Sequence, residues 1–482
     1  MTWQADMEMK PKNRKHTFSN DIISNLDAVG IATLVKSKEI SAEEVAAACI
    51  ARAKDVNPSI NAIVTDNFEA SKGLAKSQTS GFFQGVPTFI KDMTYVEGIP
   101  TYFGSKAFAK AKPSRKTDGI AKQIFAQGFV NLGTSSMPEF GFTCTTEFQH
   151  DEPTRNPWNL NHSTGGSSGG SAALVAAGVV PLAHTADGGG STRIPASCCG
   201  LVGLKPQRGR LLFSELFRTQ IVEIAIDGVA TRTVRDTAHF YAEAEKYHRN
   251  KRLPAIGLVE GPSTRKYKIG YTNHSVKHYK ADELTSGVLE HTAKLLASLG
   301  HEVKEITMPV KDQFHEDFAN LWSMSAYAVH KFGGIAIKNE FDKKGLSELT
   351  LGLSKRYTKN MLQTPFFVQR LRNSYYDYQR YLKDLDVDFL LTPTVSHAAP
   401  EIGKLGINQD FEEMFEKVMN WACFTPYANA CGCPTISLPV GHDLINDLPI
   451  GMTLWSNHGL EKDLLDIAYQ LEAAQSWKKI YE

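Results

Sequence analysis

The chain has 482 residues, enough for two or three domains of ordinary size. Its 53 Lys and Arg nearly balance its 52 Asp and Glu, so no overall charge attracts nucleic acid or an anionic membrane. The hydrophobic fraction of 42% supports a large buried core, which excludes intrinsic disorder. The longest apolar stretch, 172–183, is shorter than the roughly 20 residues of a membrane span, so the sequence predicts no integral membrane segment.

Residues 1–18 are predicted to be a polar N-terminal tail, because they lack the apolar core of a signal peptide. The basic residues of this tail, which we expect to be solvated, are Lys10, Lys12, Arg14 and Lys15. The seven cysteines are an odd number, which argues against a disulfide framework. Neither Cys198-Cys199 nor Cys431-Gly432-Cys433 has the spacing of a zinc site, so no metal is expected. We expect the protein to be cytoplasmic.

The first part of the chain after the tail alternates between helical and strand patterns. Ser41 and Glu44 form a capping box, which predicts a helix up to about Asp55, before Asn57-Pro58. Short apolar strands are then predicted at 86–90 and 129–132, with a helix at 118–127 between them. This alternation is typical of an α/β sheet with helices on both faces.

The second half returns to the same pattern after a helical stretch. Residues from about 250 to 385 are predicted to be mostly helical, followed by strands at 387–391 and 435–439 and a helix at about 461–475. No clear linker divides the chain. We therefore treat 19–482 as one domain, with a mostly helical insertion at about 250–385 covering the active site.

Two glycine-rich turns interrupt the pattern, at 165–171 (Gly-Gly-Ser-Ser-Gly-Gly-Ser) and 187–195 (Asp-Gly-Gly-Gly-Ser-Thr-Arg-Ile-Pro). A flexible linker would not enclose the apolar helix predicted at 172–177. A phosphate-binding loop is disfavoured because neither G-x-x-x-x-G-K-[ST] nor a G-x-G-x-x-G that opens a helix is present. The string Gly165-x-Ser167-x-Gly169 matches a nucleophile elbow, but no hydrophobic strand precedes it.

Lys91 ends the apolar run that begins at Val86. Such a lysine ordinarily extends its amine to solvent. If the amine is instead desolvated and neutral, it can take a proton from a serine hydroxyl, which is the Ser-Lys form of nucleophilic catalysis.

These motifs resemble those of the amidase signature family. Residues 165–171 match that family's Gly-Gly-Ser-Ser-Gly-Gly-Ser intact, and 187–195 match its second motif except at Gly188 and Thr192. Residues 199–206 match except at Leu201, residues 86–92 and the Met-Pro-Glu-Phe turn at 137–140 also match, and the similarity extends over nearly the whole chain. The resemblance implies an amidase signature fold, with a large twisted mixed β-sheet covered by helices on both faces.

Carried over residue by residue, the resemblance implies a Ser-cisSer-Lys triad. Ser191 would attack the amide carbonyl to form an acyl-enzyme, and Ser167, in a cis peptide, would relay its proton to Lys91. The N–H groups of Gly188, Gly189 and Gly190 would form the oxyanion hole. The supporting residues implied are Asp187, Arg193 and Ser168, and Met137 is a further candidate for substrate binding.

The substrate is expected to be a small, hydrophobic, linear or cyclic amide, or a carbamate, as for enzymes similar to 6-aminohexanoate-cyclic-dimer hydrolase. No organic cofactor and no nucleic-acid or membrane partner is implied, and a homodimer is one expectation from similar enzymes. Aromatic residues proposed to line the pocket are Phe140, Trp322, Tyr327, Phe366 and Phe367.

Two alternatives stay open. The first is a glutamine-hydrolysing subunit like the A subunit of the tRNA-dependent amidotransferase, although residues 324–333 lack the Arg and Asp expected to hold glutamine. The second is a non-catalytic amide-binding paralogue, against which stands the presence of all three triad residues.

Overall fold

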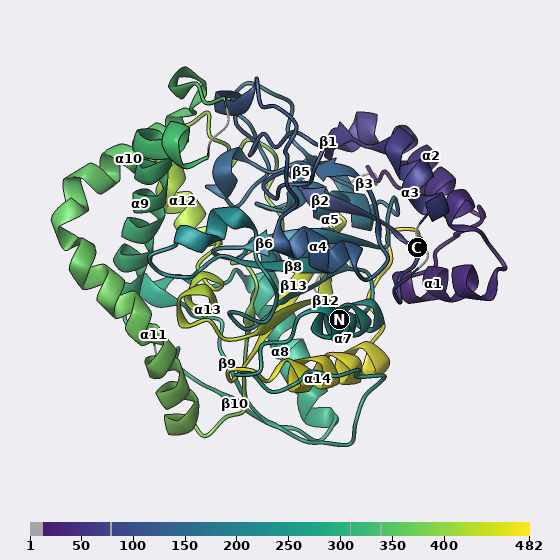
Figure 1. Cartoon of the computed structure of the whole chain (residues 1–482). Coiled ribbons are helices and arrows are strands. Elements are labelled where there is room, and N and C mark those ends of the chain that lie inside the picture. Colours follow the sequence, from purple (N-terminus) through teal and green to yellow (C-terminus); the bar gives the residue numbers. More distant parts are fainter. Residues whose placement is uncertain (1–12, 78–79, 309, 338–339) are drawn as a thin grey trace.

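The computed structural model describes residues 13–77, 80–308, 310–337 and 340–482 (Figure 1). The largest sheet found in these ranges is mixed and has eight strands, of which only the β10–β9 and β9–β11 pairs are parallel. From edge to edge the strands are β10 (Glu302–Glu305), β9 (Lys268–Tyr271), β11 (Phe389–Pro393), β13 (Leu448–Ser456), β12 (Thr435–Asp443), β7 (Val202–Lys205), β8 (Ile226–Thr231) and β6 (Leu182–Asp187).

A smaller sheet of three strands lies against the β6 edge. Its order is β1 (Ile63–Asp66), β3 (Val130–Ser135) and β2 (Pro87–Lys91), with β2 parallel to β3. Side chains join β2 to β6: Thr88 Oγ1 donates to the Leu182 carbonyl at 3.0 Å, and the Lys91 N–H donates to His184 Nδ1 at 3.2 Å. Lys91 therefore lies at the seam between the two sheets.

Helices cover both faces of the large sheet, as predicted. The short buried helix α6 (Arg193–Cys199) packs on β7, β12 and β13, whereas α8 (Glu283–Ser298) and α14 (Glu461–Ala474) also pack on β12 and β13, and α7 (Val234–Tyr247) on β7 and β8. The contact of α6 is close: a Cβ at Gly203 would lie 2.6 Å from Ala196 Cβ, so β7 needs glycine there. The helix α5 (Gly169–Ala176) is also wholly buried.

Two groups of helices lie on opposite sides of the molecule. Figure 1 shows α1 (Ala28–Ser37), α2 (Ala42–Ile60) and α3 (Phe68–Ser77) on the side opposite α9 (Gln313–Ala336), α10 (Glu348–Asn360) and α11 (Thr364–Asp384). The shorter elements are α4 (Gly119–Phe125), α12 (Phe411–Trp421), α13 (Pro426–Cys431) and the β4–β5 hairpin (Arg155–Asn156 and Asn159–Ser163). None of the helices in the described ranges is both long and apolar enough to cross a membrane.

One boundary prediction is wrong. Helix α2 continues through Pro58 to Ile60. It ends only at left-handed Asn61, whose N–H donates to the Asn57 carbonyl at 2.8 Å. The stretch 250–385 is mostly helical, but β9 and β10 lie inside it and extend the large sheet. Strand β10 is an edge strand with exposed glutamates at both ends, so its apolar signal is weak.

Part of the N-terminal tail packs on the fold, although Asn13 is exposed and Lys15 partly exposed. Arg14 Nη2 lies 2.8 Å from Asp447 Oδ1, and the guanidinium lies 4.9 Å from the centre of the Trp158 ring. Thr17 Oγ1 donates to the Ala177 carbonyl at 2.9 Å. The prediction fails for these polar groups because they find partners across the fold; Lys10 and Lys12 lie outside the described residues.

Candidate active site

The Lys91 amine is buried and faces a serine. Its side chain leaves the end of β2, and Nζ lies 2.7 Å from Ser167 Oγ and 3.3 Å from the Ala186 carbonyl oxygen. Burial lowers the pKa of Lys91 to about 7, against the opposing effect of the Asp187 and Asp227 charges. A neutral amine has a lone pair, so Lys91 can accept a proton from the serine near neutral pH.

Ser167 lies just before α5, and the Gly166–Ser167 peptide bond is cis. Gly141 passes close beside it, with a φ of +71°, and a Cβ at Gly141 would lie 2.9 Å from Ser167 Oγ. Only glycine meets both conditions without strain. The adjacent Ser168 bonds to β6 instead: its Oγ accepts the Ala186 N–H at 3.2 Å. The resemblance predicts both the cis bond and the turn.

A buried ion pair holds the turn that carries Ser191. The Asp187 carboxylate accepts bonds from Arg193 Nη2 at 2.9 Å and from the Thr192 N–H at 3.1 Å. Burial alone would raise the pKa of Asp187, but the charge and hydrogen bonds of Arg193 hold that pKa well below its ordinary value. Asn429 on α13, which the sequence analysis missed, donates to Asp187 Oδ1 at 2.9 Å.

The N–H groups of this turn point in two directions. Gly188, Gly189 and Ser191 border a cavity, and their N–H groups have no hydrogen-bond acceptor in the part of the chain that the structure describes. The Gly190 N–H differs, because it donates inward to Asp187 Oδ1 at 2.7 Å. The prediction of Gly190 as an oxyanion donor is therefore wrong, since the fold already uses its N–H. The Ser191 N–H, which has no acceptor among the described residues, is a candidate donor in its place.

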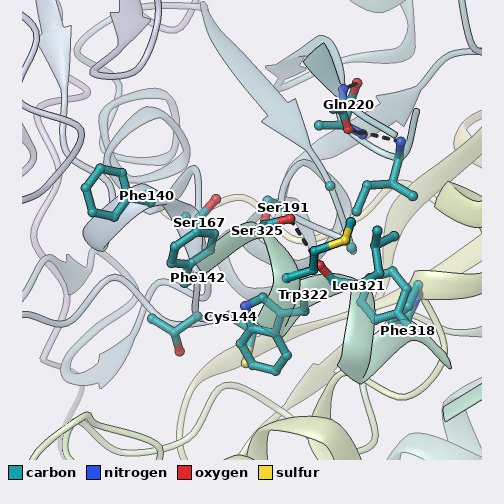
Figure 2. A pocket seen from close by; sticks show the side chains of 18 of the residues that line it. Phe140, Phe142, Cys144, Ser167, Ser191, Gln220, Phe318, Leu321, Trp322 and Ser325 are labelled. Carbon is teal, nitrogen blue, oxygen red and sulfur yellow. Dashed lines mark hydrogen bonds between the residues drawn. The ribbon is translucent and has the colours of Figure 1, made fainter. Parts of the chain in front are cut away.

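The cavity has a volume of about 410 Å³, and Lys91 lies on its border. Ser167 and Ser191 border it too (Figure 2). Among the described residues that line it, Lys91 is the only Lys, Arg, Asp or Glu. Large apolar side chains from the 140–144 loop and from α9 form much of the wall, among them Phe140, Phe142, Phe318, Leu321 and Trp322. The 216–225 segment closes another part of it, braced by Gln220, whose Oε1 accepts the Ala225 N–H at 2.9 Å.

The predicted pocket residues separate into two groups. Phe140 and Trp322 line the cavity, but Met137, Tyr327, Phe366 and Phe367 do not. Met137 is buried beneath its turn, and Tyr327 packs against Tyr357 with ring centres 5.1 Å apart. On α11, Phe367 is in the core and Phe366 is 60% exposed. The helical pattern indicates which residues are apolar, but not which of them face an empty space.

The structure brings a further buried pair to Lys91, which the sequence analysis did not identify. His184 and Asp227 are fully buried, with His184 Nε2 3.0 Å from Asp227 Oδ1. No local motif marks them, because they lie on different strands. No group of three or more His, Cys, Asp or Glu within the described ranges is arranged to hold a metal ion.

Comparison with known proteins adds the family to this geometry. The family model named Amidase matches residues 44–465. The chain belongs to the amidase family. It is 41% identical to the AmiC protein of Mycobacterium leprae (strain TN) over 469 residues, which cover 97% of this chain and 99% of that protein.

A second relative is the 6-aminohexanoate-cyclic-dimer hydrolase of Paenarthrobacter ureafaciens, which is 33% identical over 475 residues, covering 94% of this chain and 95% of that enzyme. The structure of a 6-aminohexanoate cyclic dimer hydrolase complexed with substrate superposes with a TM-score of 0.86 at 31% identity, covering 95% of this chain and 98% of the other. These matches confirm the resemblance, the amidase signature fold and the prediction that the protein is an amidase.

Proposed function

We propose that this amidase hydrolyses small, neutral, hydrophobic amides through an acyl-enzyme on Ser191. The observation that carries the proposal is the 2.7 Å contact between Lys91 Nζ and Ser167 Oγ beside a cavity that Ser191 also borders. The pKa of Lys91, near 7, supports the assignment of this amine as the base.

In the first half of the reaction, Ser191 Oγ attacks the carbonyl carbon. Its proton passes to Ser167 Oγ as the Ser167 proton passes to Lys91 Nζ. The oxygen that gains negative charge accepts bonds from N–H groups of Gly188, Gly189 and Ser191, and each such donor is typically worth about 2.7–4 kcal/mol. The C–N bond then breaks, and the leaving amine takes a proton back from Lys91 through Ser167.

In the second half, water attacks the Ser191 ester by the same route. Its proton goes through Ser167 to Lys91 and returns to Ser191 Oγ as the acid leaves. The net reaction is amide plus water giving carboxylic acid plus amine. Ser168, Asp187 and Arg193 take no proton in this scheme, since they hold the two turns in place.

The wall of the cavity supports a neutral, apolar substrate. Free glutamine carries an ammonium and a carboxylate, and the described lining has no Asp, Glu or Arg to pair with them. Burying unpaired charges is costly, so we place glutamine low among substrates. The segment expected to hold glutamine, 324–333, instead contributes Met324, Ala328, Val329 and Phe332 to the wall.

The test is amine or ammonia release from a hydrophobic acyl anilide, a cyclic diamide, a carbamate, a primary aliphatic amide and glutamine. We expect the hydrophobic amides to be hydrolysed at least 100-fold faster than glutamine. We also expect Ser191→Ala to reduce turnover by at least about 1,000-fold. Undiminished turnover by Ser191→Ala would refute the acyl-enzyme, and a preference for glutamine would refute the substrate class.

A further inference from the structure

On the side that faces β6, the backbone of Lys91 is held by a histidine and not by a strand; on its other side β2 pairs with β3, where Lys91 is in register with Ser135. Strand β2 is the edge of the small sheet and β6 is the edge of the large one, and the two are not paired in a ladder. At the end of β2, the Lys91 N–H donates to His184 Nδ1 at 3.2 Å. The imidazole therefore takes the place of a strand carbonyl at the residue whose side chain carries the amine.

The other side of the imidazole is fixed by a carboxylate. Because Nδ1 accepts from Lys91, the ring proton lies on Nε2, and this atom donates to Asp227 Oδ1 at 3.0 Å. Asp227 also accepts bonds from the Ser214 N–H at 2.8 Å and the Ser214 Oγ at 2.9 Å. All these side chains are fully buried, so the imidazole has one orientation and one tautomer.

The same carboxylate is connected to the wall of the cavity. Ser214 comes directly before the short helical turn Glu215–Thr219, which begins the 216–225 segment of the wall. Ser214 Oγ also lies 2.6 Å from Thr94 Oγ1, three residues beyond Lys91. Asp227 thus joins the end of β2 to the segment that encloses the substrate.

We propose that His184, oriented by Asp227, is the positioning residue that fixes Lys91 within reach of Ser167. The proposal rests on the proposed function, in which Lys91 is the base. His184 touches neither the cavity nor Ser167, and it acts only through the Lys91 backbone. A displacement of about 1 Å at a reacting group can cost 100-fold in rate, so an anchor at this point matters to turnover.

Asp227 has a second, electrostatic effect on Lys91. The charged groups that face the amine are Asp187 at the end of β6 and Asp227 on β8, and both oppose the effect of burial on its pKa. Loss of the Asp227 charge therefore makes the Lys91 ammonium less stable. The pH below which Lys91 becomes protonated then falls.

The test compares His184→Leu, His184→Asn and Asp227→Asn with the wild type. In His184→Asn the side-chain oxygen can replace Nδ1 as the acceptor for Lys91, whereas in His184→Leu nothing can. The matched control is Thr88→Val, which removes another bond across the same seam without touching Lys91. The readouts are kcat and KM for the best amide, and the pH dependence of Ser191 labelling by a fluorophosphonate, normalised to folded protein by thermal melting.

We expect His184→Leu to lower kcat by about 10- to 100-fold with KM changed less than twofold, and His184→Asn to recover part of the loss. Asp227→Asn should move the acid limb of labelling towards lower pH by about 0.5 unit or more. Thr88→Val should leave kcat and KM within twofold of wild type and the acid limb of labelling unchanged.

The inference is overturned if folded His184→Leu keeps wild-type kcat and an unchanged acid limb, or if Thr88→Val loses as much as His184→Leu. Failure of the proposed function gives a different result. In that case Lys91→Met would label and turn over like the wild type, or the wild type would not label at Ser191.

Discussion

The pH dependence of catalysis provides the sharpest test of the site. Lys91 must be neutral to accept a proton, and its pKa is lowered from 10.5 to about 7 by burial. At the ordinary pKa, roughly 1 amine in 3,000 would be neutral at pH 7, whereas at a pKa of about 7 half of the amines are neutral. The lowered pKa therefore supplies about three orders of magnitude in active base at neutral pH.

The assay is the hydrolysis of a neutral acyl anilide by wild type between pH 5 and 9 at constant ionic strength, with the substrate below KM. We expect log kcat/KM to rise by one unit per pH unit up to about pH 7 and then to level off as Lys91 becomes neutral. Neither the ionisation of the neutral anilide nor that of the aniline product limits the step in this range. Lys91→Met, which has similar length and no basic group, should lose at least about 1,000-fold and show no such limb.

A rate that is independent of pH from 5 to 8, or that is still rising at pH 9, would refute the assignment of a buried neutral lysine as the base. The same shift has a consequence for stability. Between pH 7 and 10.5 the unfolded chain binds one more proton at this lysine than the native chain does. Wild-type stability should therefore gain about 1.4 kcal/mol per pH unit from Lys91 in that window, and Lys91→Met should lack this contribution.

Three further substitutions test the surroundings. Gly141→Ala should lower kcat by about 10- to 100-fold in initial-rate assays, because its Cβ would lie 2.9 Å from Ser167 Oγ at a φ of +71°; Gly73→Ala, which meets no atom within 4 Å, is the control that should keep full activity. Asp187→Asn should lose about 3–5 kcal/mol in urea unfolding at pH 7, because it leaves the buried Arg193 charge without its carboxylate, with only neutral acceptors on Thr425 and Asn429. The pair stabilises the fold above about pH 4, and this stabilisation is lost as the pH falls further. The difference in unfolding free energy between wild type and Asp187→Asn should therefore be smaller at pH 3 than at pH 7, and the same difference at both pH values would contradict this. Arg14→Ala should lower the free energy of unfolding by about 1.5–3 kcal/mol, since its partner Asp447 is buried. An unchanged melting temperature would instead support the prediction of a solvated tail.

The residues proposed to react could be singled out from sequence because each lies in a contiguous motif. Lys91 ends an apolar strand, and Ser167 and Ser191 lie in glycine-rich turns whose residue order is itself the signal. The same holds for Asp187 and Arg193, which are six residues apart and meet across one turn.

What the sequence could not supply is pairing across the fold. Asn429 reaches Asp187 from α13, and Asp227 reaches His184 from β8, with nothing in either local sequence to indicate the partner. The Gly190 error has a related origin. Three successive glycines look equivalent in sequence, but the chain turns the Gly190 N–H inward to Asp187, and only coordinates reveal that direction.

The reactive groups and the cavity wall come from different parts of the chain. Lys91, Ser167 and Ser191 project from β2 and from the turns before α5 and α6. Lys91 and Ser167 are buried and bonded to each other, and the Ser168 N–H donates to the Ser191 carbonyl at 3.3 Å. Much of the wall comes from α9 and the 216–225 segment, which supply side chains but none of these three groups. Residues such as Leu321 and Trp322 can therefore be exchanged without disturbing the hydrogen bonds of the groups proposed to react. Such a division allows a lineage, or a protein engineer, to change the substrates accepted while the reaction itself is inherited intact.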